Sequence, residues 1–157
     1  MNFAVFASGR GTNFSAIAKA VKKGKIKASL ALLVCDNPKA KVLAKAKRTG
    51  VKVALVKEED FTTKKDFEGK IIQQLKEQNI DLIVLAGFMR LLSPEFISQY
   101  RNKILNIHPA LLPAFKGREG IKDAFAHGVK VTGVTVHFVD EEMDHGPIIL
   151  QQAVKIE

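Results

Sequence analysis

The chain has 157 residues, which is enough for one domain with a hydrophobic core and too few for two domains of ordinary size. Apolar residues make up 46% of it and the mean hydropathy is +0.03, values that are typical of a globular protein and exclude a disordered chain. No apolar run approaches the roughly 20 residues that span a bilayer, and the N-terminus lacks the charged start of a signal peptide, so we expect a cytoplasmic protein.

The net charge of +9 raises the question of nucleic-acid binding. The sequence has no Trp, one Tyr and no run of more than two consecutive Lys or Arg, so the stacking surface and the dense basic tract of a single-strand binder are missing. The lysines from Lys19 to Lys52 alternate with apolar residues, which favours a solvated surface. Positive potential of this kind would still steer small anionic substrates.

Strand-length apolar runs alternate with amphipathic stretches along most of the chain. This alternation predicts an α/β fold with a mostly parallel, twisted sheet flanked by helices and joined by right-handed crossovers. Pro38 and Pro94 stand where a helix would start, and Gly24 and Gly50 where one would end. Cys35 closes the second run and is expected to be a buried thiol. The expected strands span residues 2–8, 28–35, 51–56, 81–86 and 103–107, and the expected helices span residues 13–23, 39–48, 64–79 and a short stretch after Pro94.

The last part of the sequence has a different pattern. Residues 131–139 and 147–156 are β-rich and are separated only by the acidic loop 140–146, which is too short for a helical crossover. We therefore expect an antiparallel strand pair near the C-terminus. His127 precedes Gly128 at an expected helix end, where a positive group suits the helix dipole.

A glycine-rich turn, residues 8–13, lies between the first strand and the first helix. Turns at this place bind anions through free backbone N–H groups and the helix dipole. A dinucleotide-binding fingerprint fails because Phe14 stands at its third glycine, and the lysine of a P-loop is missing. A phosphate site is the better interpretation, and a plain tight turn stays open as the alternative.

Asn106, His108 and Asp144 combine an amide, an imidazole and a carboxylate, which suits acyl-type transfer. Asn106 and His108 alternate around Ile107, so their side chains point to one face of an extended segment. Asp144 would orient the imidazole and favour its charged form, and the ring with the Asn106 amide would stabilise an oxyanion. The alternative for Asn106 and His108 is that they are hydrogen-bonded core residues. The acidic loop 140–146 could instead be a solvated turn, or could bind a metal together with His137 and His145, although the usual ligand spacing is missing.

Several segments in the right order resemble the glycinamide ribonucleotide formyltransferases of purine biosynthesis, a group of 10-formyltetrahydrofolate-dependent formyltransferases. The resemblance implies a Rossmann-like formyltransferase fold. It also implies transfer of a formyl group from 10-formyltetrahydrofolate to the amine of 5'-phosphoribosylglycinamide in de novo purine (IMP) biosynthesis. The segments that resemble this family are residues 9–13, 85–90 and 106–113, together with Asp144, Gly146 and Pro147.

The resemblance also assigns the site residues. Lys64 stands where some relatives use Arg to meet the charged tail of the folate, so the positive charge is kept and bidentate geometry is lost. The reaction needs small-molecule substrates, with no metal, nucleic acid or membrane, and a monomer or homodimer is expected. The implied catalytic residues are Asn106, His108 and Asp144; the phosphoribosylglycinamide site has Gly11, Thr12, Asn13 and Pro109; and the folate site has Lys64, Met89, Arg90, Leu91, Leu92, Asn106, Asp140, Glu141 and Asp144.

The resemblance implies a single formyltransferase domain over residues 1–157. Family members continue with a further strand and helix beyond the position of Glu157, and this sequence lacks that segment. Two alternatives stay open: a related formyltetrahydrofolate-using enzyme, such as a methionyl-tRNA formyltransferase or a formyltetrahydrofolate hydrolase, and a non-catalytic, truncated folate- or nucleotide-binding protein.

Overall fold

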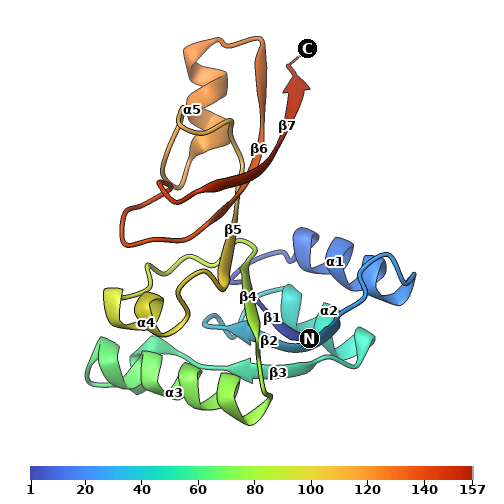
Figure 1. Cartoon of the computed structure of the whole chain (residues 1–157), viewed down its shortest axis with the longest axis vertical. Helices are drawn as coiled ribbons and strands as arrows, with labels where there is room; N and C mark the ends of the chain where they lie inside the picture. Colours follow the sequence, from blue (N-terminus) through green and yellow to red (C-terminus); the bar gives the residue numbers. More distant parts are fainter. Residues whose placement is uncertain (157) are drawn as a thin grey trace. The chain divides into compact units, whose positions relative to one another are not determined.

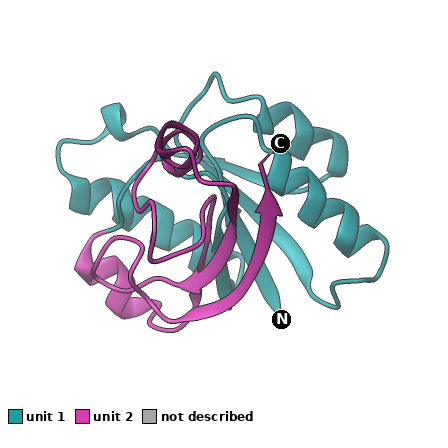
Figure 2. Cartoon of the chain, turned by 90° about the horizontal axis from the view of Figure 1, so that it is seen from above, with its two compact units in different colours: residues 1–92 teal, residues 93–157 magenta. Residues whose placement is uncertain are grey.

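The computed structural model describes residues 1–156 and divides the chain into two compact units, residues 1–92 and residues 93–157 (Figure 2). The single-domain organisation stays a prediction. Within the described part of the chain, no helix has both the length and the apolar character needed to cross a membrane.

Unit 1 is a four-stranded parallel sheet in the order β3-β2-β1-β4. Helices α1 and α2 cover one face and α3 the other (Figure 1), which is the arrangement that right-handed crossovers give for this strand order. The predicted strands and helices of this unit are confirmed, apart from small shifts at their ends. The elements are β1 (Asn2–Phe6), α1 (Thr12–Lys22), β2 (Ser29–Cys35), α2 (Val42–Thr49), β3 (Lys52–Leu55), η1 (Glu58–Asp60), α3 (Lys64–Glu77) and β4 (Leu82–Leu85).

The core of unit 1 lies between the sheet and its helices. Phe14 of α1 and Phe67 of α3 are fully buried, so Phe14 uses the space that a dinucleotide-binding glycine would leave open. Cys35 is buried as predicted, and burial raises the pKa of its thiol. This combination describes an unreactive packing residue.

The expectation that Pro38 starts a helix is wrong, because α2 begins at Val42. Asn37 shapes the chain here instead: its side-chain oxygen accepts a hydrogen bond from the Lys39 N–H (2.9 Å), and its amide donates to the Ser8 carbonyl (3.1 Å). Such a local side-chain turn competes with helix formation. Gly50 ends α2 as predicted.

Unit 2 is an antiparallel sheet in which β6 pairs with β5 on one side and with β7 on the other. The predicted C-terminal strand pair is therefore confirmed. Helix α5 was not among the expected helices, although His127 does end it before Gly128, as expected. The elements are α4 (Pro94–Gln99), β5 (Ile104–His108), α5 (Gly120–His127), β6 (Val131–Phe138) and β7 (Ile148–Lys155).

Candidate active site

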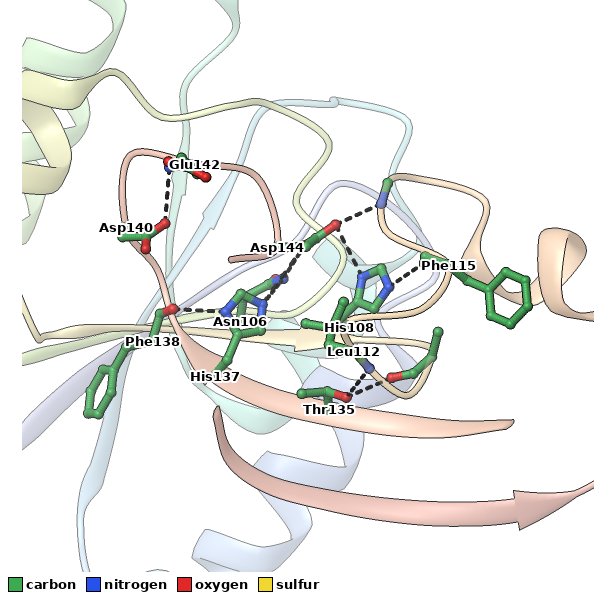
Figure 3. Close-up of polar contacts among 12 residues, drawn as sticks. Asn106, His108, Leu112, Phe115, Thr135, His137, Phe138, Asp140, Glu142 and Asp144 are labelled. Atoms are coloured by element: carbon green, nitrogen blue, oxygen red, sulfur yellow. Dashed lines mark hydrogen bonds and ion pairs between the residues drawn. The ribbon is translucent and has the colours of Figure 1, made fainter. Parts of the chain in front are cut away.

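Asn106, His108 and Asp144 lie together in unit 2 (Figure 3). Asn106 and His108 come from β5 and alternate around Ile107, and Asp144 approaches both from the loop between β6 and β7. The His108 Nδ1 to Asp144 Oδ2 distance is 3.5 Å, and the Asn106 amide nitrogen lies 3.5 Å from Asp144 Oδ1. The three side chains that the sequence singled out are thus neighbours.

The His108 ring is held by contacts at both nitrogens. Its side chain is 3% exposed, and Nε2 lies 2.8 Å from the Phe115 carbonyl, which can only accept a hydrogen bond. Nε2 therefore carries a proton, and Nδ1 faces the Asp144 carboxylate. A second proton on Nδ1 makes the ring a cation that points at a carboxylate.

Asp144 is positioned by its backbone and by a loop amide. Its φ of 51° is unusual for a residue with a side chain, and the Gly117 N–H donates to its Oδ2 at 2.7 Å. Gly146 lies at the end of the same loop and packs against the Phe138 carbonyl, which a Cβ at position 146 would overlap. The loop conformation that presents Asp144 therefore depends on glycine two residues later.

His137 belongs to this cluster and was not predicted as one of its members. It stands opposite Asn106 in the register of β5 and β6. Its Nδ1 donates to the Phe138 carbonyl (2.8 Å), so Nε2 accepts a hydrogen bond from the Asn106 amide (3.1 Å). Thr135 and His137 alternate on a β-rich run, the same signal that singled out Asn106 and His108.

The loop that follows His108 is tied to β6. Thr135 is buried; its hydroxyl donates to the Ala110 carbonyl (2.7 Å) and accepts from the Leu112 N–H (3.1 Å). Pro109, expected near the phosphoribosylglycinamide, lies half-buried between His108 and this anchored loop. The chain leaving β5 is thereby fixed within a few residues of the candidate catalytic ring.

Asp140 and Glu141, expected around the folate, are both paired at the surface of unit 2. Asp140 contacts His145 Nδ1 at 2.8 Å, and the Arg101 guanidinium donates to Glu141 at 2.8 Å. Burial acts to raise the pKa of Asp140, but hydrogen bonds from His145 and the Glu142 N–H outweigh it, so that pKa lies below its ordinary value. The hydrogen bond with Asp140 raises the pKa of His145 in turn.

The glycine-rich turn lies in unit 1, at the start of α1. Gly11 has a φ of 68°, and a Cβ there would overlap the Val42 side chain, so the position requires glycine. Thr12 and Asn13 are exposed in the first helical turn, which contains no acidic residue. The turn therefore presents free N–H groups and polar side chains of the kind that bind a phosphate.

Met89 and Arg90 follow β4, the strand beside β1. Ser8 joins the two strand ends, because its hydroxyl accepts the Met89 N–H (3.0 Å) and its own N–H donates to the Gly87 carbonyl (3.0 Å). Arg90 is ion-paired with Asp36 (2.8 Å) and with Glu58. Ser8 thus connects two segments that the sequence assigned to different ligands.

The remaining expected folate residues of unit 1 are two leucines that follow Arg90 and one lysine in α3. Leu91 is exposed, Leu92 is half-buried, and Lys64 is exposed in the first turn of α3. No hydrogen bond or ion pair within residues 1–156 joins Lys64 to the segment 89–92. The structure therefore joins Met89 to Ser8 of the glycine-rich turn, and within residues 1–156 Lys64 has no hydrogen bond or ion pair with residues 89–92.

No group of three or more His, Cys, Asp and Glu side chains within residues 1–156 could hold a metal ion. His137, one member of the alternative metal set, uses both ring nitrogens in hydrogen bonds to protein groups. The absence of a metal requirement stays a prediction.

The whole chain, residues 1–157, matches the family model described as formyl transferase, and the chain belongs to that family. It is 49% identical over 155 residues to the phosphoribosylglycinamide formyltransferase of Bacillus subtilis, which covers 99% of this chain and 80% of that protein. It is also 39% identical over 153 residues to the human trifunctional purine biosynthetic protein adenosine-3, of which it spans 15%.

Among solved structures, glycinamide ribonucleotide transformylase 1 from Geobacillus kaustophilus is 52% identical and superposes with a TM-score of 0.96. The match covers 99% of this chain and 83% of that one. Phosphoribosylglycinamide formyltransferase from Bacillus halodurans also superposes with a TM-score of 0.96, at 48% identity. The predicted fold class, a Rossmann-like formyltransferase fold with a C-terminal antiparallel pair, is confirmed.

Proposed function

We propose that this protein transfers the formyl group of 10-formyltetrahydrofolate to the amine of 5'-phosphoribosylglycinamide, a one-carbon transfer in de novo purine (IMP) biosynthesis. The names of its relatives support this acceptor, and membership of the formyl transferase family supports a formyl donor. The observation that carries the proposal is the approach of Asp144 to both His108 and Asn106, at 3.5 Å each.

The proposed reaction is a direct acyl transfer. The amine lone pair forms a new C–N bond to the formyl carbon while the carbonyl π electrons move to oxygen. When the carbonyl forms again, the bond to the folate nitrogen breaks and its electron pair stays on that nitrogen. The proton lost by the amine replaces this bond, and a water near Asp144 is the proposed shuttle.

His108 and Asn106 are proposed to stabilise the oxyanion that forms in this step. A charged imidazole would stabilise such an oxygen through its positive charge, and the Asn106 N–H that faces Asp144 Oδ1 at 3.5 Å is the more loosely held donor that would turn to it. Asp144 orients the ring and balances its charge from the Nδ1 side. His137 and Gly117 position these groups by holding the Asn106 amide and the Asp144 carboxylate.

The substrate sites are proposed from the residues that match the family. The turn at Gly11, Thr12 and Asn13 would bind the substrate phosphate, with Pro109 near the phosphoribosylglycinamide. The exposed polar first turn of α1 supports this assignment. The proposed folate residues are Lys64, Met89, Arg90, Leu91, Leu92, Asn106, Asp140, Glu141 and Asp144.

We further propose that the substrates are small molecules alone, with no metal, nucleic acid or membrane, and that the protein is a cytoplasmic monomer or homodimer. Size-exclusion chromatography with light scattering measures the oligomeric state directly.

The proposal is tested by incubating the purified protein with 10-formyltetrahydrofolate and phosphoribosylglycinamide and following the formylated product. Formation of this product, with no product from initiator methionyl-tRNA and no hydrolysis when the acceptor is absent, is the expected result. Folate binding without turnover would contradict the enzymatic function, and release of formate without an acceptor would instead identify a hydrolase.

A further inference from the structure

Arg90 in unit 1 forms ion pairs with two acidic residues, Asp36 and Glu58, called the acidic pair below. Asp36 follows β2, Glu58 lies in η1 and Arg90 follows β4, so three separate elements supply the cluster. Arg90 Nε donates to Asp36 Oδ2 at 2.8 Å, and Nη1 contacts a Glu58 carboxylate oxygen. One cation therefore faces two carboxylates.

The two carboxylates differ in burial. The Asp36 side chain is 5% exposed, whereas those of Glu58 and Arg90 are each 43% exposed. Within residues 1–156, the second oxygen of Asp36 has no hydrogen-bond partner, so Arg90 is its ion-pair partner through the other oxygen alone. Asp36 is thus a fixed anchor for the guanidinium, and Glu58 is a solvent-accessible partner that another carboxylate could replace.

The two acidic residues that follow Glu58 share one cation. Lys57 contacts Glu59 at 3.3 Å and Asp60 at 3.1 Å, so the other two acidic residues of η1 have a local partner. Glu58 alone turns to Arg90 from this short helix. Glu59 therefore serves as a matched reference: the same side chain, in the same turn, with a different partner.

We propose that Glu58 is a specificity-determining residue that occupies the outer side of the Arg90 guanidinium in place of a ligand carboxylate, while Asp36 positions the guanidinium from within. This inference rests on the proposed function, in which Arg90 belongs to the donor site. The carboxylates of the donor's glutamate tail are the ligand groups with the chemistry to replace Glu58.

Two consequences follow for donor recognition. A tail carboxylate gains a bidentate contact with the outer side of Arg90, through Nη1 and Nη2, only by displacing Glu58 from Nη1, so the tail adds less to affinity than a free guanidinium would give it. Glu58 and Asp36 also repel an anionic tail, and this repulsion weakens as salt screens it. The acidic pair thereby lowers selectivity for donors with additional glutamates.

The test compares 10-formyltetrahydrofolate with the tailless donor 10-formyltetrahydropteroate in the wild-type protein, Glu58→Gln and Glu59→Gln. Glu58→Gln is expected to lower KM for the tailed donor by about two- to fivefold, the size of an exposed ion-pair effect, and to leave KM for the tailless donor unchanged. The effect appears in KM rather than in kcat, shrinks in high salt and is absent in Glu59→Gln.

An equal change in KM for both donors, or no change for the tailed donor, would overturn the inference while leaving the proposed function intact. If formyl transfer itself is absent, the same comparison is made by calorimetry with tetrahydrofolate and tetrahydropteroate. A selective gain in tetrahydrofolate affinity in Glu58→Gln then supports the inference without the function, and the lack of such a gain overturns both.

Discussion

At the scale of single residues, Arg90 is the partner on which a buried charge depends. Arg90→Ala leaves the Asp36 carboxylate in the protein interior without its counter-ion, and such a loss costs about 1–3 kcal/mol of unfolding free energy. Urea denaturation measures this change. Asp36→Asn added to Arg90→Ala is expected to restore part of the stability, and a double variant less stable than Arg90→Ala would contradict the assignment.

The His145 and Asp140 pair makes the acidic loop sensitive to pH. Because the pKa of His145 is raised in the folded protein, its stabilising contribution is complete below about 6.5, its ordinary value, and is lost as the pH rises through the folded pKa. Because the net pKa of Asp140 is lowered, its contribution is present above its ordinary value and is lost as the pH falls through the folded pKa.

The pair therefore stabilises the loop most between these two limits, in mildly acidic solution. NMR titration of the His145 ring in the wild-type protein and in Asp140→Asn measures the coupling. The variant is expected to show a lower His145 pKa. Identical titration curves would mean that Asp140 has no influence on this ring.

At the scale of elements, the loop between β6 and β7 is the most sterically restricted segment of the candidate site. A Cβ at Gly146 would overlap the Phe138 carbonyl, so Gly146→Ala must shift the loop that presents Asp144. We expect a loss of about 1–3 kcal/mol in unfolding free energy, the usual range for overpacking, together with slower formyl transfer.

Gly69→Ala is the matched control, because Gly69 lies inside α3 and a Cβ there meets nothing within 4 Å. This control is expected to raise stability by about 1 kcal/mol through helix propensity. Thermal unfolding compares the two variants, and a neutral Gly146→Ala would contradict the steric account.

The elements also show where prediction from sequence succeeds and fails. Apolar runs located β1 and β2 because most of their residues are buried on both faces of a parallel sheet, and the shorter run of the edge strand β3 was found although it is partly exposed. Pro38 was misleading because Asn37 forms a side-chain turn there, and the body of α5 was missed because no side chain caps its N-terminus, although Gly128 marked its end. Apolar patterns in the sequence therefore locate helices and strands, but hydrogen bonds of nearby polar side chains such as Asn37 decide at which residue an element begins.

The candidate site was predictable in part for the same reason. Asn106 and His108 share a face by simple alternation, and Asp144 was chosen as a carboxylate able to orient the imidazole. Alternation with Thr135 marks the face of His137, but its pairing with Asn106 comes from the register of β5 and β6, and the contact of Asp36 with Arg90 spans 54 positions in sequence. Pairings of this kind depend on the tertiary fold, which no local pattern encodes.

At the scale of the whole molecule, the positive charge is strongly uneven along the sequence. From residue 11 to residue 57 the sole acidic residue is Asp36, which is buried, while eleven Lys and Arg residues lie between Lys19 and Lys52. Such a surface raises the encounter rate of anionic substrates. Both proposed substrates are anions.

We therefore expect kcat/KM for the proposed reaction to fall as salt increases. Replacing Lys41 and Lys45 together by Gln should flatten that dependence, because fewer charges remain to attract the substrates. Steady-state kinetics from low to physiological ionic strength measures both slopes. A rate independent of salt in the wild-type protein would exclude steering, and equal slopes would exclude these two lysines as its source.

The central claim is that Asn106, His108 and Asp144 act as one unit in formyl transfer. It is tested most directly by the single-turnover rate of formyl transfer to phosphoribosylglycinamide in His108→Ala, Asp144→Asn and the double variant, with folding checked by circular dichroism. Each single change is expected to lower the rate about 10²- to 10⁴-fold, and the double change to cost little more than the worse single one. Wild-type rates in either single variant, or losses that multiply in the double variant, would contradict the account.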